Sequence, residues 1–380
     1  MRDRPLHLVT DVLFSSDGES LLTGGAERWC RDLAISAAIR GFNVTVYQRS
    51  SVPFSRPLAD SITVVGVRSS LSAVGALVFS RWLHRNRDAT IPVIYVSPLA
   101  GMGHRRGRAV AINHGIWWDG DFQRTKLALI TVLHRRLLKV MEGIICVDTA
   151  FINWCHSVLP NRSRWCHKLV YLPNYADARV FRRTAVFKNE RLRILFPRRM
   201  QGPTLARDSR GLGLLLEALT IGLSRGMDFH LTLAGRCTLQ ADVIAFTSSR
   251  GWADRVSFVE APLDGMADLY NSSDVVVIPS IGHEGTSLSA IEAMMCGRPV
   301  VVTHIGGLCN LAIDGVTAHV SDLTPLLLAD AIQRAANNPP RPEVVKSLRE
   351  QLSKERWDER LWQHLCKFLS LRVPRRQFGA

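Results

Sequence analysis

Two patterns of apolar residues alternate along the first half of the chain. Short apolar runs predict buried strands, and longer segments with apolar residues every three or four positions predict amphipathic helices. A strand at 6–10, a helix at 25–40 ended by Gly41, and a strand at 44–47 open the chain. This order favours a parallel sheet. Further strands are expected at 62–65, 93–96, 109–112 and 143–147, and helices at 71–86 and 123–141.

The periodicity stops between Leu172 and about Glu190 and then resumes. Such a stretch, with Pro173 and Asn174 at its start, is typical of a linker. The pattern therefore predicts an α/β protein with two Rossmann-like, doubly wound domains. The expected strands of the second half are 193–196, 230–234, 256–259, 275–278 and 300–303, and the helices 212–225, 264–271, 287–296, 324–337 and 357–371.

The turn after the predicted strand at 275–278 is the most informative segment. It opens at the carboxyl end of a buried parallel strand, where ligands bind in such sheets. Thr286 or Ser287 can cap the next helix, whose first N–H groups suit a phosphate. Glu284 lies outside that cap and Glu292 more than a turn inside the helix. Their carboxylates can accept hydrogen bonds from a sugar phosphate, or the segment is simply a capped helix with two solvated glutamates.

Composition narrows the class of protein. A chain of 380 residues is long enough for two cores, and its apolar content of 47% fits a globular protein. No apolar run reaches the roughly 18 residues that would span a bilayer. The first ten residues lack the pattern of a signal peptide, so a cytoplasmic protein is expected. The eight cysteines are scattered, which predicts reduced thiols rather than a disulfide scaffold or a metal knuckle.

The positive charge is concentrated in one half. Of the formal net charge of +15, residues 1–190 carry +12, with 26 Lys and Arg against 14 Asp and Glu. We expect this half to meet an acidic partner, such as a lipid phosphate, an anionic membrane or a nucleic acid, unless its arginines are merely solvated. Trp117 and Trp118 before the basic segment 123–141, with more charge at 104–108, fit an anionic membrane surface, or an ordinary surface helix.

Several other residues stand where chemistry is expected. Arg199 ends a strand and Arg210 opens a helix, so the two cations could hold a diphosphate or form an exposed basic loop. His114 follows an apolar strand and precedes a glycine, although a lone histidine is more often structural. Gly24 and Gly25 allow a ligand to approach the backbone, or serve a tight turn alone. They do not complete the G-x-G-x-x-G fingerprint of a nicotinamide enzyme.

Four of these segments together resemble a known family. The glutamate turn, its continuation at 297–308, the loop at 23–28 and the segment 173–181 occur in the order found in the retaining GT-B glycosyltransferases of family four. The resemblance spans about residues 7 to 320 and implies the GT-B fold, in which the two Rossmann-like, doubly wound domains face each other across a cleft. It implies an N-terminal acceptor-side domain at 1–172, a linker at 173–190, a nucleotide-sugar domain at 191–355 and a C-terminal helix at 356–380 that returns to the first domain.

The resemblance also implies roles for residues. Glu284 and His114 become the catalytic candidates, with Glu284 near the transferred sugar and His114 on the acceptor side. Glu292 would bind the ribose. Arg210 stands where the family usually has a lysine, and Asn310 where many relatives have a glutamate, so contacts at both positions are open. The donor-binding candidates are Arg199, Arg210, Glu292, Gly285, Thr286, Ser287, Leu288, Gly24 and Gly25.

The expected function is retaining transfer of a hexose from a UDP- or GDP-linked donor to a glycan or lipid-linked glycan, as in polysaccharide biosynthesis. The chain lacks an obvious paired-aspartate cation motif, so no metal and no cofactor are expected. The expected location is cytoplasmic, with peripheral contact at the inner face of the membrane. A sugar-nucleotide epimerase or a basic binding protein are the alternatives. Nucleic acid is not expected as a partner, because the paired glutamates would repel a polyanion.

Overall fold

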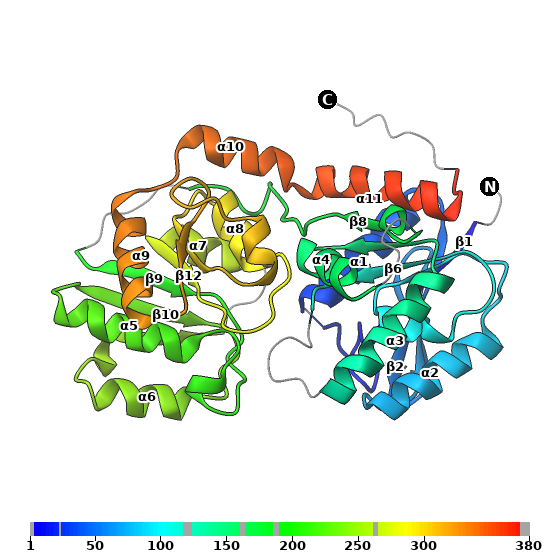
Figure 1. Cartoon of the computed structure of the whole chain (residues 1–380), viewed down its shortest axis with the longest axis horizontal. Coiled ribbons are helices and arrows are strands. Elements are labelled where there is room, and N and C mark those ends of the chain that lie inside the picture. Colours follow the sequence, from blue (N-terminus) through cyan, green and yellow to red (C-terminus); the bar gives the residue numbers. More distant parts are fainter. Residues whose placement is uncertain are drawn as a thin grey trace.

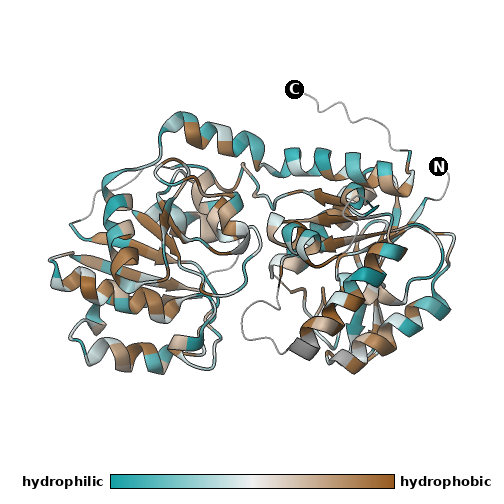
Figure 2. Cartoon of the chain, viewed as in Figure 1, coloured by the Kyte–Doolittle hydropathy of each residue, from teal (hydrophilic) through white to brown (hydrophobic). Residues whose placement is uncertain are grey.

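The computed structural model describes residues 4–22, 24–116, 124–159, 164–184, 190–260 and 265–372. Within these ranges the chain forms two α/β units that lie side by side, with two helices running across both at one edge (Figure 1). Each unit is built on a parallel sheet covered by helices, which confirms the predicted fold class. Apolar residues are concentrated on the strands and on the helix faces that cover them (Figure 2).

The N-terminal sheet has the order β3-β4-β2-β1-β5-β6-β7-β8. Only β3, at one edge, is antiparallel to its neighbour. The inner strands are buried on both faces, as expected of a parallel sheet between helices. The strands are β1 Pro5–Val9, β2 Asn43–Ser50, β3 Phe54–Ala59, β4 Ile62–Arg68, β5 Val93–Tyr95, β6 Ala109–Asn113, β7 Gly143–Cys146 and β8 Leu169–Tyr171.

Helices cover both faces of this sheet. One face packs against α1 (Gly25–Ile39). The other packs against α2 (Ala73–Asn86), α3 (Arg124–Val140) and α4 (Thr149–Val158). A short 3-10 segment, η1 (Pro98–Gly103), lies between α2 and α3 and contacts both. The carboxyl ends of the strands are therefore left free to meet the second unit.

The C-terminal sheet is parallel throughout, in the order β11-β10-β9-β12-β13-β14. The two helices α5 and α9 pack on one face, and α7 and α8 on the other. The strands are β9 Leu192–Phe196, β10 Phe229–Ala234, β11 Val256–Val259, β12 Val275–Ile278, β13 Val300–Thr303 and β14 His319–Ser321. The helices are α5 Leu212–Ser224, α6 Gln240–Ser248, α7 Met266–Ser272, α8 Leu288–Met295 and α9 Pro325–Asn337, with short 3-10 segments η4 Leu205–Arg207, η5 Ala253–Arg255 and η7 Gly306–Asn310.

The last two helices bridge the units. α10 (Pro342–Gln351) packs on α8 of the C-terminal unit, and α11 (Lys354–Leu369) packs on the N-terminal unit. Trp362 of α11 stacks on Phe42 with ring centroids 5.5 Å apart, and its Nε1 donates to Ser36 Oγ over 2.7 Å. The apolar face of α11 thus completes a core that begins with the first strand of the chain.

Candidate functional site

A cleft of about 990 Å³ lies between the two units. Its N-terminal wall comes from the loops after β1, β5 and β6 and from the first turn of α1. Its C-terminal wall comes from the loops after β9 and β12 and from the first turn of α8. The predicted site residues that line it are Gly25, His114, Arg199, Arg210, Glu284, Gly285, Thr286, Ser287 and Leu288.

Glu284 is the centre of charge on the C-terminal wall. Its side chain is only 8% exposed, and its Oε2 accepts from Arg198 Nη2, from Arg210 Nη1 over 2.7 Å and from Ser280 Oγ over 2.9 Å. Burial alone would raise the pKa of Glu284, but the two guanidiniums hold it below its ordinary value. Glu284 is therefore anionic, and the pattern-based alternative of a solvated glutamate at this position is wrong.

Arg198 is the partner that sequence reasoning missed. It is buried and joins Glu284 to Ser287 Oγ, to which its Nη1 donates over 3.2 Å. Arg199 is exposed and points to the other side, where its Nη2 lies 2.8 Å from the point that a Cβ on Gly24 would occupy. Of the two adjacent arginines, one therefore holds the glutamate and the other reaches across the cleft.

Glu292 lies behind the cleft lining and is only 5% exposed. Its Oε1 accepts from Arg28 Nη1 over 2.7 Å, and its Oε2 accepts from the Tyr270 hydroxyl over 2.9 Å. Arg28 belongs to α1, so this ion pair crosses from one unit to the other. The alternative of a solvated glutamate is wrong here as well.

The prediction that the hydroxyl of Thr286 or Ser287 caps α8 is wrong. Ser287 occupies the N-cap position, but neither its hydroxyl nor that of Thr286 caps the helix. Ser287 Oγ instead accepts from Arg198, and Thr286 Oγ1 donates to the carbonyl of Val147 over 3.0 Å. Both hydroxyls are taken by long-range partners, which leaves the first-turn N–H groups of α8 as donors at the cleft.

The two units touch directly beside Glu284. A Cβ on Gly285 would lie 2.8 Å from the carbonyl oxygen of His114, and one on Gly115 would lie 3.4 Å from Gly285. Asn174 adds two hydrogen bonds to Thr286, and Asn310 exchanges two with Thr149 at the start of α4. Asn310, where the family often has a glutamate, therefore ties the two units together.

His114 lies on the N-terminal wall with its ring edge-on to Trp29, 5.6 Å between centroids. Burial lowers the pKa of His114 to about 4, against a smaller opposing effect of a hydrogen bond with the Val96 carbonyl. Its Nε2 is buried and has no hydrogen-bond partner among the described residues. The ring is thus neutral and offers one unused nitrogen.

Gly24 and Gly25 form the start of α1. Gly24 is the N-cap, and a Cβ there would overlap the carboxylate of Glu27. A Cβ on Gly25 would lie 3.2 Å from Leu288 Cδ1. The pair therefore lets the first turn of α1 approach the first turn of α8 closely, while Thr23 lies outside the described residues.

No group of three or more His, Cys, Asp or Glu side chains in the described ranges could hold a metal ion. No described helix combines the length and the hydropathy needed to cross a bilayer. Trp117 and Trp118, expected at a membrane surface, lie outside the described residues.

Known proteins match part of the chain in sequence. Residues 193–338 match the family described as glycosyl transferases group 1. The D-inositol 3-phosphate glycosyltransferase of Corynebacterium diphtheriae is 32% identical over 34% of this chain and 32% of its own. The 2-deoxystreptamine glucosyltransferase of Streptomyces kanamyceticus is 35% identical over 27% of this chain and 25% of its own. The chain thus matches about a third or less of the length of these relatives.

Solved structures match nearly the whole chain in fold. The sucrose-phosphate synthase of Thermosynechococcus elongatus has a TM-score of 0.75, with 15% identity over 97% of this chain and 99% of its own. Anabaena HepE in complex with UDP and glucose has a TM-score of 0.69, with 16% identity over 96% of this chain and 100% of its own. These likenesses show that residues 193–338 match the glycosyl transferases of group 1 in sequence and that the chain has the GT-B fold.

Proposed function

We propose that the protein is a retaining glycosyltransferase that moves a hexose from a nucleotide-diphosphate sugar to an acceptor hydroxyl. The observation that carries the proposal is the position of Glu284. Its buried carboxylate lies between two guanidiniums, next to the first turn of α8, and lines a cleft between two domains. This arrangement offers hydrogen-bond acceptors for sugar hydroxyls beside donors for a diphosphate.

The donor would lie against the C-terminal wall. Arg199 and Arg210 line the cleft there, and the free N–H groups at the start of α8 point toward it. As the bond between the sugar C1 and the diphosphate oxygen breaks, its electron pair goes to the diphosphate, whose charge these groups stabilise. A UDP donor is favoured by the fold shared with HepE, whose structure holds UDP and glucose.

Charge stabilisation of this kind needs no divalent cation, so we propose transfer without a metal. The bond from the acceptor oxygen to C1 forms on the face that the diphosphate leaves, and the acceptor proton goes to a diphosphate oxygen. Glu284, ordered by Arg198 and Ser280, would hold the sugar hydroxyls during this step. The backbones of Gly285 and His114 approach closely here, and this contact would exclude water from this end of the cleft.

We also propose that the N-terminal unit rests on an anionic membrane through α2 and α3. Both helices expose apolar side chains, with Val74, Leu77 and Val78 on α2 and Leu129 and Val132 on α3 each more than half exposed. Exposed cations continue the same faces, namely Arg81 and Arg85 on α2 and Arg136 and Lys139 on α3. An apolar stripe edged by cations is the pattern of a helix that lies in a lipid interface.

Nucleotide release tests the glycosyltransferase proposal. The purified protein is mixed with a panel of UDP- and GDP-hexoses in a chelator, with and without oligosaccharide, cyclitol or lipid-linked acceptors. Release that rises with an acceptor and is insensitive to the chelator is expected. Release that never depends on an acceptor would favour an epimerase or a hydrolase, and failure to bind any donor would contradict the proposal.

A further inference from the structure

The N-terminal wall of the cleft carries negative side chains, although the N-terminal half of the chain is positively charged. Asp11 and Glu27 line this wall, and no described Lys or Arg of the N-terminal unit does. The histidines beside them, His114 and His134, are neutral, because burial lowers the pKa of both. The described Lys and Arg side chains of this unit therefore lie away from this wall, although residues 1–190 carry a formal charge of +12.

Asp11 is the more available of the two carboxylates. Glu27 lies over the first turn of its own helix, beside Gly24. Asp11 instead follows β1, and its side chain is 49% exposed. One oxygen, Oδ1, accepts from Arg49 Nη1 over 3.0 Å, while Oδ2 accepts no hydrogen bond from the described residues. This oxygen is left for a ligand.

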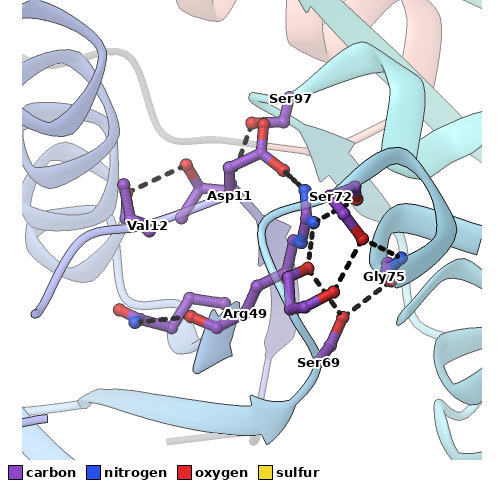
Figure 3. Close-up of polar contacts among 10 residues, drawn as sticks. Asp11, Val12, Arg49, Ser69, Ser72, Gly75 and Ser97 are labelled. Atoms are coloured by element: carbon purple, nitrogen blue, oxygen red, sulfur yellow. Dashed lines mark hydrogen bonds and ion pairs between the residues drawn. The ribbon is translucent and has the colours of Figure 1, made fainter. Parts of the chain in front are cut away.

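The position of Asp11 is rigidly determined. Its backbone N–H donates to Ser97 Oγ over 2.8 Å, and its carbonyl accepts from the Arg49 N–H over 3.0 Å (Figure 3). The guanidinium of Arg49 is 6% exposed, and its Nη2 donates to the carbonyls of Ser70 and Ser72 in the loop before α2. Both terminal nitrogens of Arg49 are therefore hydrogen-bonded within the protein. Arg49 orients Asp11 and is not available as a cation for a ligand.

Resting on the proposed function, we propose that Asp11 binds a hydroxyl or ammonium group of the acceptor, and that the acceptor is a polyol or amino sugar without a phosphate at this position. A carboxylate with a free oxygen accepts hydrogen bonds from either group. A phosphate would face the carboxylate of Asp11, and Arg199, which reaches this wall from the opposite unit, lies at Gly24 next to Glu27. Like charges would therefore exclude a phosphate at Asp11. The arginines of the opposite wall would be occupied by the donor diphosphate.

The test compares three cyclitol acceptors with the hexose donor selected above: myo-inositol, 2-deoxystreptamine and myo-inositol 1-phosphate. We expect kcat/KM to be at least about tenfold lower for the phosphate ester than for myo-inositol. The isosteric Asp11→Asn should raise KM for 2-deoxystreptamine by about tenfold and for myo-inositol by less, because only the ammonium loses a charge-assisted hydrogen bond. The KM of the donor should not change.

Asp60→Asn is the matched control. Asp60 is exposed in the turn between β3 and β4, at the amino end of β4 and away from the cleft, so the acceptor KM should not move. Binding of UDP or GDP by each variant shows that the donor site is intact. A preference for the phosphate ester, an unchanged KM in Asp11→Asn, or no response to any of the three would overturn the acceptor assignment. If the unmodified protein binds neither UDP nor GDP, the proposed function itself is overturned.

Discussion

At the scale of single residues, the site depends on one carboxylate that opposes two guanidiniums. Arg198 and Arg210 share Glu284, so the cluster keeps an excess positive charge close to the first turn of α8. Removing a partner from a buried ionic group is costly, because the remaining charge is left without compensation. A bound diphosphate would balance that excess, which links donor binding to the ordering of Glu284.

Glu284→Gln should lower kcat by about a hundredfold or more, because the amide keeps the shape but loses the charge that orders the arginines and the sugar hydroxyls. Initial rates of nucleotide release measure this. Glu343→Gln, in the exposed first turn of α10, is the control and should leave kcat unchanged. An unchanged kcat in Glu284→Gln, with the variant folded, would rule out the catalytic role.

His114 should make stability depend on pH. Its folded pKa of about 4 lies below the ordinary value of 6.5, so the unfolded chain binds a proton that the folded protein does not. Stability is therefore complete above pH 6.5 and falls as the pH is lowered toward 4, by at most about 3 kcal/mol from this group. Urea unfolding of the protein and of His114→Asn at several pH values in this range measures the free energy of unfolding. If that free energy falls equally with pH in both proteins, the burial of the ring is contradicted.

The sequence could indicate the two glutamates but not their partners. Glu284 and Glu292 were visible because they flank a turn at the end of an apolar strand, which is a local pattern. Arg198, Arg28 and Tyr270 were missed, since their contacts join residues that are 86, 264 and 22 positions away and leave no periodic signal. The roles assigned to the site residues from the family resemblance stay predictions.

At the scale of elements, buried parallel strands were the easiest to predict. β12 and β13 are continuous runs of β-branched residues that end in the core, and the expected ranges 275–278 and 300–303 match them. β3 was missed because it is an exposed edge strand that contains Pro57. α10 was missed because its apolar stripe is short, with only Val344, Val345 and Leu348, and these side chains are no more than half-buried.

The packing of α11 on the N-terminal unit should contribute strongly to stability. Trp362→Ala should lower the free energy of unfolding by about 3–5 kcal/mol, because it removes the stack on Phe42 and the hydrogen bond to Ser36. Glu359→Ala, exposed on the same helix, should cost less than about 0.5 kcal/mol. Chemical unfolding followed by tryptophan fluorescence measures both. Equal losses would mean that α11 contributes little to the core.

At the scale of the whole molecule, the exposed apolar faces of α2 and α3 predict membrane binding. Leu77→Asp should weaken co-sedimentation with vesicles that contain phosphatidylglycerol by about tenfold. Ile313→Asp is the control, because Ile313 is 62% exposed on the C-terminal unit and Leu77 is 61% exposed on the N-terminal one. Binding should also fall as salt is added. Equal binding by both variants would exclude α2 as the contact.

The return of α11 to the N-terminal unit has a consequence for folding during translation. Domains are usually finished in the order of synthesis. Here the core around Leu6, Leu8 and Trp29 also contains Trp357, Leu361 and Leu365. We therefore expect the N-terminal unit to complete its core only after α11 has left the exit tunnel. We expect the C-terminal unit to fold before it during translation, and chains cut before α11 to expose the apolar core of the N-terminal unit to chaperones and proteases.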